Sequence, residues 1–292
     1  MIDLAVLALV QGLSQGLMLF LLSSGLSIVY GWMGILQFSH AAFYMWGGYI
    51  AYSLTPSMGW LGAWVVAVLS MAVLGGAVYR WLLRPLHHQG HMSELLLTFG
   101  LLFLSGELVR WIWGSATLSY TLPDFLVPGA GSHFTSWGIS PARVLSMGVA
   151  VFVLLALAIG LRFSRWGVLF RALKSQPHML ESLGYPVQKI LTSVFALGCG
   201  LAALSGALTM LTLPLQPTMA MSMGALLFVV VVSGGLGSLW GTWWASLVIG
   251  QLFAWSALLP IAGLSSWAPA LPFLWMAWRL NRSADKTIGH RG

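Results

Sequence analysis

Long apolar runs separated by short polar stretches make up most of this chain. Most of the runs reach the roughly 20 residues that a helix needs to cross a bilayer. We therefore predict an all-α protein, a polytopic transmembrane helical bundle with about eight to nine membrane segments, some of them discontinuous. The expected segments are 4–30, 35–54, 59–83, 94–113, 141–161, 191–213, 222–233, 238–259 and 261–279.

Two of these segments differ from an ordinary span. Segment 222–233 is too short to cross alone. Segment 261–279 carries Pro269 and Pro272, so we expect it to be kinked or partly irregular.

Composition agrees with this pattern. Hydrophobic residues make up 59% of the 292 residues and charged residues only 7%, whereas soluble domains carry about 25% charge. A membrane β-barrel is excluded because its strands alternate over about ten residues. The net charge of +7 does not indicate nucleic-acid binding, because the basic residues stand at the ends of the apolar runs.

Basic residues also predict the orientation. Eleven of the 13 Lys and Arg residues fall in three stretches that share one side if all nine segments cross. The positive-inside rule makes that side cytoplasmic, so the N-terminus is expected outside and the C-terminus inside. Arg110 and Arg143 are the exceptions, at the outer ends of their spans, and Glu107 stands three residues before Arg110, which favours an ion pair there.

Small residues repeat every four positions within several runs, as at Gly198, Ala202 and Gly206. This spacing lets helix backbones approach closely, which favours packing within a membrane.

Two apolar stretches, one in the first third of the chain and one in the last, are interrupted by glycine. Paired broken helices in two halves of a transporter commonly line a substrate site. An alternative interpretation, two ordinary cytoplasmic turns, is equally consistent with the glycines. The candidate pathway residues are Gln37, Ser39, His40, Tyr44, Gly234, Gly235, Gly237 and Ser238.

The sequence offers little chemistry of its own. The chain contains no GxxxxGK[ST] motif for ATP, and charge is nearly absent from the span interiors. His87, His88 and His91 form a cluster that lacks a second group of metal ligands. We expect no cofactor, no metal and no enzymatic activity, so that transport is either passive or driven by a partner.

Three regions together resemble the permease subunits of the branched-chain amino acid ABC transporter family. The resemblance covers most of the chain and rests on the order in which these regions occur. They are GLSIVYG at 25–31 with LQFSHAAF at 36–43 and GGY at 47–49; RA at 171–172, Gly184, FA at 195–196 and LAALSG at 201–206; and VVVSGGLGS at 230–238.

The resemblance implies an ATP-driven importer that works by alternating access in the bacterial inner (plasma) membrane. Residues 1–292 would form one transmembrane permease domain, with a cytoplasmic coupling loop at about 162–190 and a cytoplasmic tail at about 280–292. Implied partners are cytoplasmic ATP-binding-cassette ATPases, a second permease that is a paralogue, a periplasmic substrate-binding protein and membrane lipid. The residues that would contact the ATPase are Arg171, Ala172, Glu181 and Gly184.

The substrate stays open at this point. Branched-chain amino acids, urea, amides and aromatic acids are all compatible with the resemblance. A passive channel or facilitator for a small solute is the alternative function, and a membrane enzyme that uses Ser39 or His40 is a third.

Overall fold

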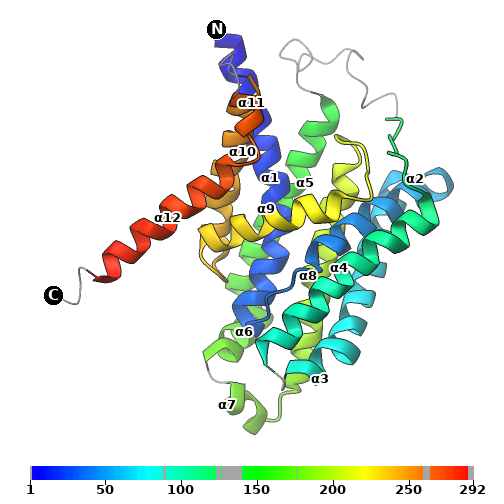
Figure 1. The fold of residues 1–292 in the computed structure, drawn as a ribbon. Helices are drawn as coiled ribbons and strands as arrows, with labels where there is room; N and C mark the ends of the chain where they lie inside the picture. The colour runs from blue at the N-terminus through cyan, green and yellow to red at the C-terminus, as the bar shows by residue number, and fades with distance from the viewer. Residues whose placement is uncertain are drawn as a thin grey trace.

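A computed structural model describes residues 2–87, 90–122, 126, 140–175, 177–258 and 264–288. Within these ranges the secondary structure is almost entirely helical (Figure 1). One antiparallel bridge, between Leu118 and Leu215, is the sole extended pairing in the described ranges. The helices are α1 (Ile2–Met33), α2 (His40–Val78), the π-helix η1 (Tyr79–Leu83), α3 (Arg84–Leu86), α4 (His91–Trp113), α5 (Pro141–Phe163), α6 (Arg165–Ser175), α7 (Pro177–Ser182), α8 (Val187–Thr209), α9 (Met219–Gly234), α10 (Leu239–Leu258), α11 (Leu264–Trp267) and α12 (Leu271–Ile288).

Five of the described helices are long and apolar enough to cross a membrane, which confirms an all-α membrane protein. The predicted segments 35–54 and 59–83 are two arms of α2, which reverses direction at Gly59 (φ 73°, ψ 168°) (Figure 1). Pro56 precedes this turn and weakens the helix there. The total of eight to nine segments stays a prediction.

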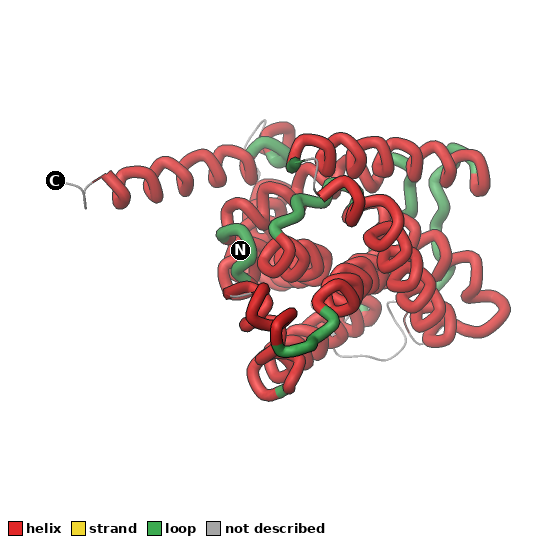
Figure 2. Tube along the Cα trace, turned by 90° about the horizontal axis from the view of Figure 1, so that it is seen from below, coloured by secondary structure: helices red, strands yellow, loops and turns green. Residues whose placement is uncertain are grey.

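The two segments that differ from an ordinary span, 222–233 and 261–279, have the structures that their sequences predict. Helix α9 has 16 residues and is shorter than a full span. Turn residues 268–270 separate α11 from α12, so the region around Pro269 is broken. Helix α12 projects sideways from the bundle (Figure 1 and Figure 2).

Helices α1, α2, α8 and α10 form the centre of the bundle, and their backbones are in direct contact. A Cβ atom on Gly206 of α8 would overlap the carbonyl oxygen of Tyr44 in α2. A Cβ atom on Gly25 of α1 would lie 2.5 Å from the carbonyl oxygen of Gly198 in α8. The close approach that the small-residue spacing predicts is confirmed.

Buried hydroxyl groups also link these helices. The Thr242 hydroxyl donates to the Ser238 carbonyl (2.8 Å), so the Ser27 hydroxyl, 2.6 Å away, donates to Thr242 and joins α1 to α10. The Ser205 hydroxyl donates to the Met18 carbonyl (3.2 Å) and joins α8 to α1. In an apolar surrounding such bonds fix the register of neighbouring helices.

A second hydrophobic cluster holds α6 and α7 against the ends of α1 and α8, at the lower end of the molecule in Figure 1. We call it the coupling cluster, and its buried members are Ile28, Phe170, Leu173, Leu180, Val187, Ile190 and Val194. The ring of Trp32 in α1 stacks on Phe170 of α6, with ring centroids 4.4 Å apart and planes at 12°.

Candidate functional site

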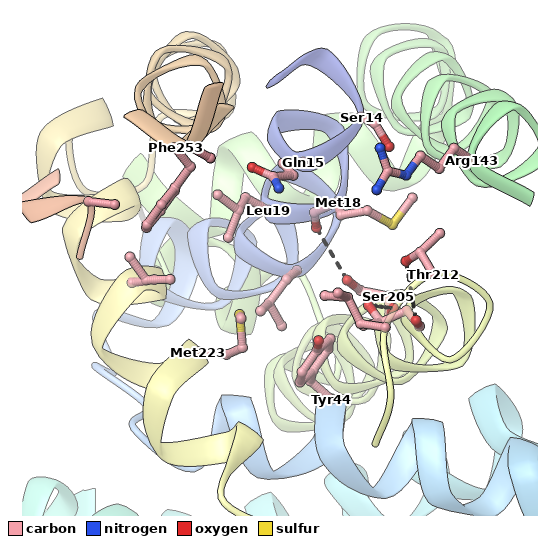
Figure 3. A pocket seen from close by; sticks show the side chains of 16 residues that line it. Ser14, Gln15, Met18, Leu19, Tyr44, Arg143, Ser205, Thr212, Met223 and Phe253 are labelled. Carbon is pink, nitrogen blue, oxygen red and sulfur yellow. Dashed lines mark hydrogen bonds between the residues drawn. The ribbon is translucent and has the colours of Figure 1, made fainter. Parts of the chain in front are cut away.

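A cavity of about 350 Å³ opens between α1, α2, α5, α8, α9 and α10. Figure 3 shows it from close by, with α1 and α5 on one side and α8 on another. Its lining residues are Ser14, Gln15, Met18, Leu19, Leu22, Tyr44, Arg143, Ser205, Thr209, Thr212, Leu213, Met223, Leu226, Phe253, Ala257 and Ala268. We call it the central cavity.

The central cavity has a polar side and an apolar side. Arg143 extends from the first turn of α5 towards Ser14 of α1, and the amide of Gln15 points into the same space (Figure 3). Opposite them the lining is hydrophobic, with Met223 and Phe253 among the side chains that face the opening. Small-molecule sites typically combine an apolar wall with a few placed polar groups in this way.

Hydroxyl groups of α8 and the turn after it form a further part of the polar side. The hydroxyls of Ser205, Thr209 and Thr212 donate to the carbonyls of Met18 (3.2 Å), Ser205 (2.8 Å) and Thr209 (3.2 Å), respectively. Each proton is therefore committed to the backbone, and each oxygen keeps lone pairs that can accept hydrogen bonds. The Thr209 oxygen already shares a hydrogen bond with the buried Tyr44 hydroxyl.

Arg143 differs from the other lining residues in its charge. It is the one charged side chain among the described residues of the cavity wall. Arg110 forms the ion pair that its sequence predicts, with Nη1 2.6 Å from Oε1 of Glu107. Within the described ranges Arg143 has no such carboxylate partner. Both arginines stand at the outer ends of their spans, and the sequence signal that separates them is a carboxylate three residues away, which Arg143 lacks.

Of the predicted pathway residues, Tyr44 lines the central cavity. Gln37, Ser39 and His40 lie in and after the turn between α1 and α2, and all three are almost completely buried. The Gln37 amide donates to Ser39 Oγ (3.3 Å) and to Cys199 Sγ (3.9 Å). Neither ring nitrogen of His40 forms a hydrogen bond within normal geometry to another described residue.

The second glycine stretch forms the turn between α9 and α10. Gly235 and Gly237 have positive φ angles of 93° and 77°, which favour glycine. The Gly241 amide donates to Ser238 Oγ (3.1 Å), so Ser238 caps the start of α10. Gly234 is buried beneath this turn, where a Cβ atom would lie 2.5 Å from the Thr242 nitrogen.

The two glycine stretches meet in space. A Cβ atom on Gly237 would lie 2.5 Å from the Cα atom of Gly31. Gly31, Gly34 and Leu236 border a second cavity of about 610 Å³, whose wall also includes Arg84 and Glu181. The two glycine turns thus meet at the end of α1, whereas Tyr44 lines the central cavity, nearer the middle of α1.

The predicted coupling residues lie in and after α6 and α7. Ala172 is half-buried in α6 beside the coupling cluster, and Glu181 is exposed in α7. Gly184 is exposed and has a φ of 81°, so the turn expected there is present. Arg171 belongs to α6, and its side chain lies outside the described residues.

The two described histidines of the cluster, His87 and His91, are exposed, with side chains 49% and 80% accessible, and both lie beside a buried carboxylate. His87 Nδ1 contacts Glu94 Oε1, and His91 Nδ1 lies 3.6 Å from Glu94 Oε2. Glu94 is 2% exposed, so its carboxylate is enclosed rather than solvated. His88 lies outside the described residues.

Comparison with known proteins decides the family. The model of a family described as "Branched-chain amino acid transport system / permease component" matches residues 8–278. This chain belongs to that family. The resemblance that the three sequence regions indicate is therefore confirmed.

Curated relatives extend this result over most of the chain. The high-affinity branched-chain amino acid transport system permease protein LivH of Escherichia coli K12 is 26% identical over 82% of each chain. The corresponding protein BraD of Pseudomonas aeruginosa is 28% identical over 85% of each chain. A probable branched-chain amino acid transport permease, LivH of Methanocaldococcus jannaschii, is 23% identical over 80% of this chain and 75% of its own length. A comparison with solved structures finds no match.

Proposed function

We propose that this chain is the transmembrane permease subunit of an ATP-driven importer in the bacterial inner membrane. It takes up branched-chain amino acids or a related small polar solute by alternating access. Residues 1–292 act as one permease domain, paired with a second permease, which is a paralogue, and served by a periplasmic binding protein. Cytoplasmic ATP-binding-cassette ATPases supply the energy. Family membership and the names of the curated relatives support this proposal.

The observation that carries the proposal is the exposed apolar surface around α7. Met179 and Leu183 are 58% and 64% exposed, and Tyr185 is 45% exposed. Leu180, between them, is 5% exposed and belongs to the coupling cluster. One face of this segment is thus fixed to the bundle while the other offers apolar contacts, as expected for a segment that docks on a partner.

The coupling cluster provides a mechanical connection to the central cavity. Helix α1 contributes Ile28 and Trp32 to the packing around α6, and Ser14 to the cavity wall. Ser14 and Ile28 are 14 residues apart, or about 21 Å along a helix. Helix α8 likewise contributes Ile190 to the cluster and Thr209 to the cavity. A displacement of α6 and α7 would move both helices and change the cavity.

The roles of the predicted residues are part of this proposal. Arg171, Ala172, Glu181 and Gly184 form or shape the ATPase contact at the cytoplasmic end. The residues that line the substrate pathway are Gln37, Ser39, His40, Tyr44, Gly234, Gly235, Gly237 and Ser238. The N-terminus is then periplasmic and the C-terminus cytoplasmic.

Co-purification tests the ATPase contact. We expect tagged wild-type protein in mild detergent to recover an ATPase that contains a P-loop, and the Leu183→Asp variant to lose it. Gln188→Asp is the matched control, because Gln188 is also exposed but lies in the first turn of α8. Equal recovery by all three proteins, or by none, would contradict the proposed docking surface.

A further inference from the structure

The central cavity carries the strongest unassigned feature of the molecule, a charged side chain that faces an otherwise neutral space. Arg143 is half-buried in the first turn of α5. The lining residues that the structure describes include no Asp or Glu. A guanidinium offers five donors in a fork that matches a carboxylate. The cavity therefore favours a solute that brings its own negative group.

The rest of the wall is suited to the other parts of a small amino acid. The oxygens of Ser205, Thr209 and Thr212 keep lone pairs that can accept from an ammonium group. The apolar side can enclose an aliphatic side chain, and its members are Leu19, Leu22, Met223, Leu226 and Phe253. The volume of about 350 Å³ lies at the lower end of the range for small-molecule pockets.

The position of Arg143 in α5 indicates on which side of the membrane the central cavity lies. Helix α5 leads at Phe163 directly into α6, at the end of the bundle that holds the coupling cluster. Arg143 lies 20 residues before Phe163, or about 30 Å away along a helix. It is thus far from the end at which the ATPase is proposed to dock, and close to the opposite face of the membrane.

We propose that the central cavity is a solute-binding site on the periplasmic half of the permease and that Arg143 binds the carboxylate of the transported amino acid. The α8 hydroxyl oxygens accept from its ammonium group, and the apolar side holds its side chain. This assignment rests on the proposed function, and it excludes urea and simple amides as preferred solutes because they carry no anionic group.

A binding experiment on the purified chain in detergent tests the site without the ATPase. The probes are leucine, 4-methylpentanoate, which keeps the carboxylate but lacks the ammonium group, and isopentylamine, which has the opposite deletion. We expect wild-type protein to bind leucine best and 4-methylpentanoate more tightly than isopentylamine. This order is measured on the unaltered chain, so it does not depend on whether a variant folds.

Variants then test the residue. Arg143→Gln should weaken leucine and 4-methylpentanoate about tenfold or more, as expected for the loss of a charge-assisted hydrogen bond. Arg143→Lys keeps the charge but not the forked donor geometry, so its affinity for leucine should lie between those of wild type and Arg143→Gln. Arg110→Gln is the matched control, because Arg110 stands at the end of α4 and is paired with Glu107; its affinities should be unchanged.

Several results would overturn the assignment. Wild-type protein could show no saturable leucine binding, or could bind isopentylamine as tightly as leucine. The Arg143→Gln variant could bind leucine as tightly as wild type. Phosphatidylglycerol could displace leucine, which would assign Arg143 to a lipid headgroup. Failure here is separable from failure of the proposed function. If the assembled complex takes up leucine with ATP and Arg143→Gln has no effect, the site is wrong and the importer stands.

Discussion

Replacing Phe170 with alanine should uncouple ATP hydrolysis from transport. Phe170 is 8% exposed and stacks on Trp32, and it is the largest of the described side chains that α6 contributes to the coupling cluster. The substitution leaves a void between α6 and α1. We expect the effect to be centred on α6, because Phe170 belongs to this cluster and not to the main core, which adjoins it at Leu191 and Leu201.

The magnitude follows from the packing. Phe→Ala substitutions at packed sites cost about 3–5 kcal/mol, and the lost aromatic stack is part of that figure. At about 1.4 kcal/mol for each factor of ten, the equilibrium between docked and undocked α6 shifts by roughly two orders of magnitude or more. We expect the variant to assemble with its ATPase, hydrolyse ATP and transport at least tenfold less solute per ATP.

The assay is simultaneous measurement of ATP hydrolysis and solute uptake in proteoliposomes that hold the complete complex. Val168→Ala is the matched control, since Val168 lies on the same helix but is 58% exposed, and its coupling ratio should equal that of wild type. An unchanged ratio for Phe170→Ala would refute the claim that the cluster transmits force. Loss of both activities together would show that the cluster serves assembly instead.

Further predictions concern the free energy of unfolding, measured in detergent. Gly206→Ala places a Cβ atom on the carbonyl oxygen of Tyr44, so it should lower the stability by about 1–3 kcal/mol. Gly148→Ala is the control, because Gly148 has open space around it, and it should be neutral or stabilising by up to about 1 kcal/mol. Equal effects of the two substitutions would contradict the close packing of α2 and α8. Thr242→Val removes the acceptor of the Ser27 hydroxyl and should cost about 0.6–1.7 kcal/mol. A double-mutant cycle with Ser27→Ala should give a coupling energy of similar size, and additive effects would argue against that bond.

Features that depend on local spacing could be predicted from the sequence. Apolar runs predict the helices, because a membrane span must form its backbone hydrogen bonds within the same segment. The repeat that contains Gly198 and Gly206 predicts the close contacts between helices. Gly184 marks a turn because few other residues adopt a positive φ. The family follows from three motifs in the correct order.

Features that depend on long-range assembly could not be predicted. The central cavity joins Ser14, Arg143 and Thr212, which are more than 60 residues apart in sequence, and nothing local indicates that they share a wall. Glycine stretches predict a pathway because they interrupt helices, and glycine marks a tight turn as readily as a broken span, so the pathway role of these residues stays a prediction. Tyr44 is the one predicted pathway residue that the structure places in the central cavity wall.

The most direct test of the account is uptake of radiolabelled leucine into proteoliposomes that contain this chain. The proteins compared are the chain alone and the chain with its partner permease, binding protein and ATPase. The account predicts uptake against a gradient that requires ATP and the complete set, and no uptake by the chain alone. Leucine entry through the chain alone, indifferent to ATP, would contradict it and identify a passive facilitator.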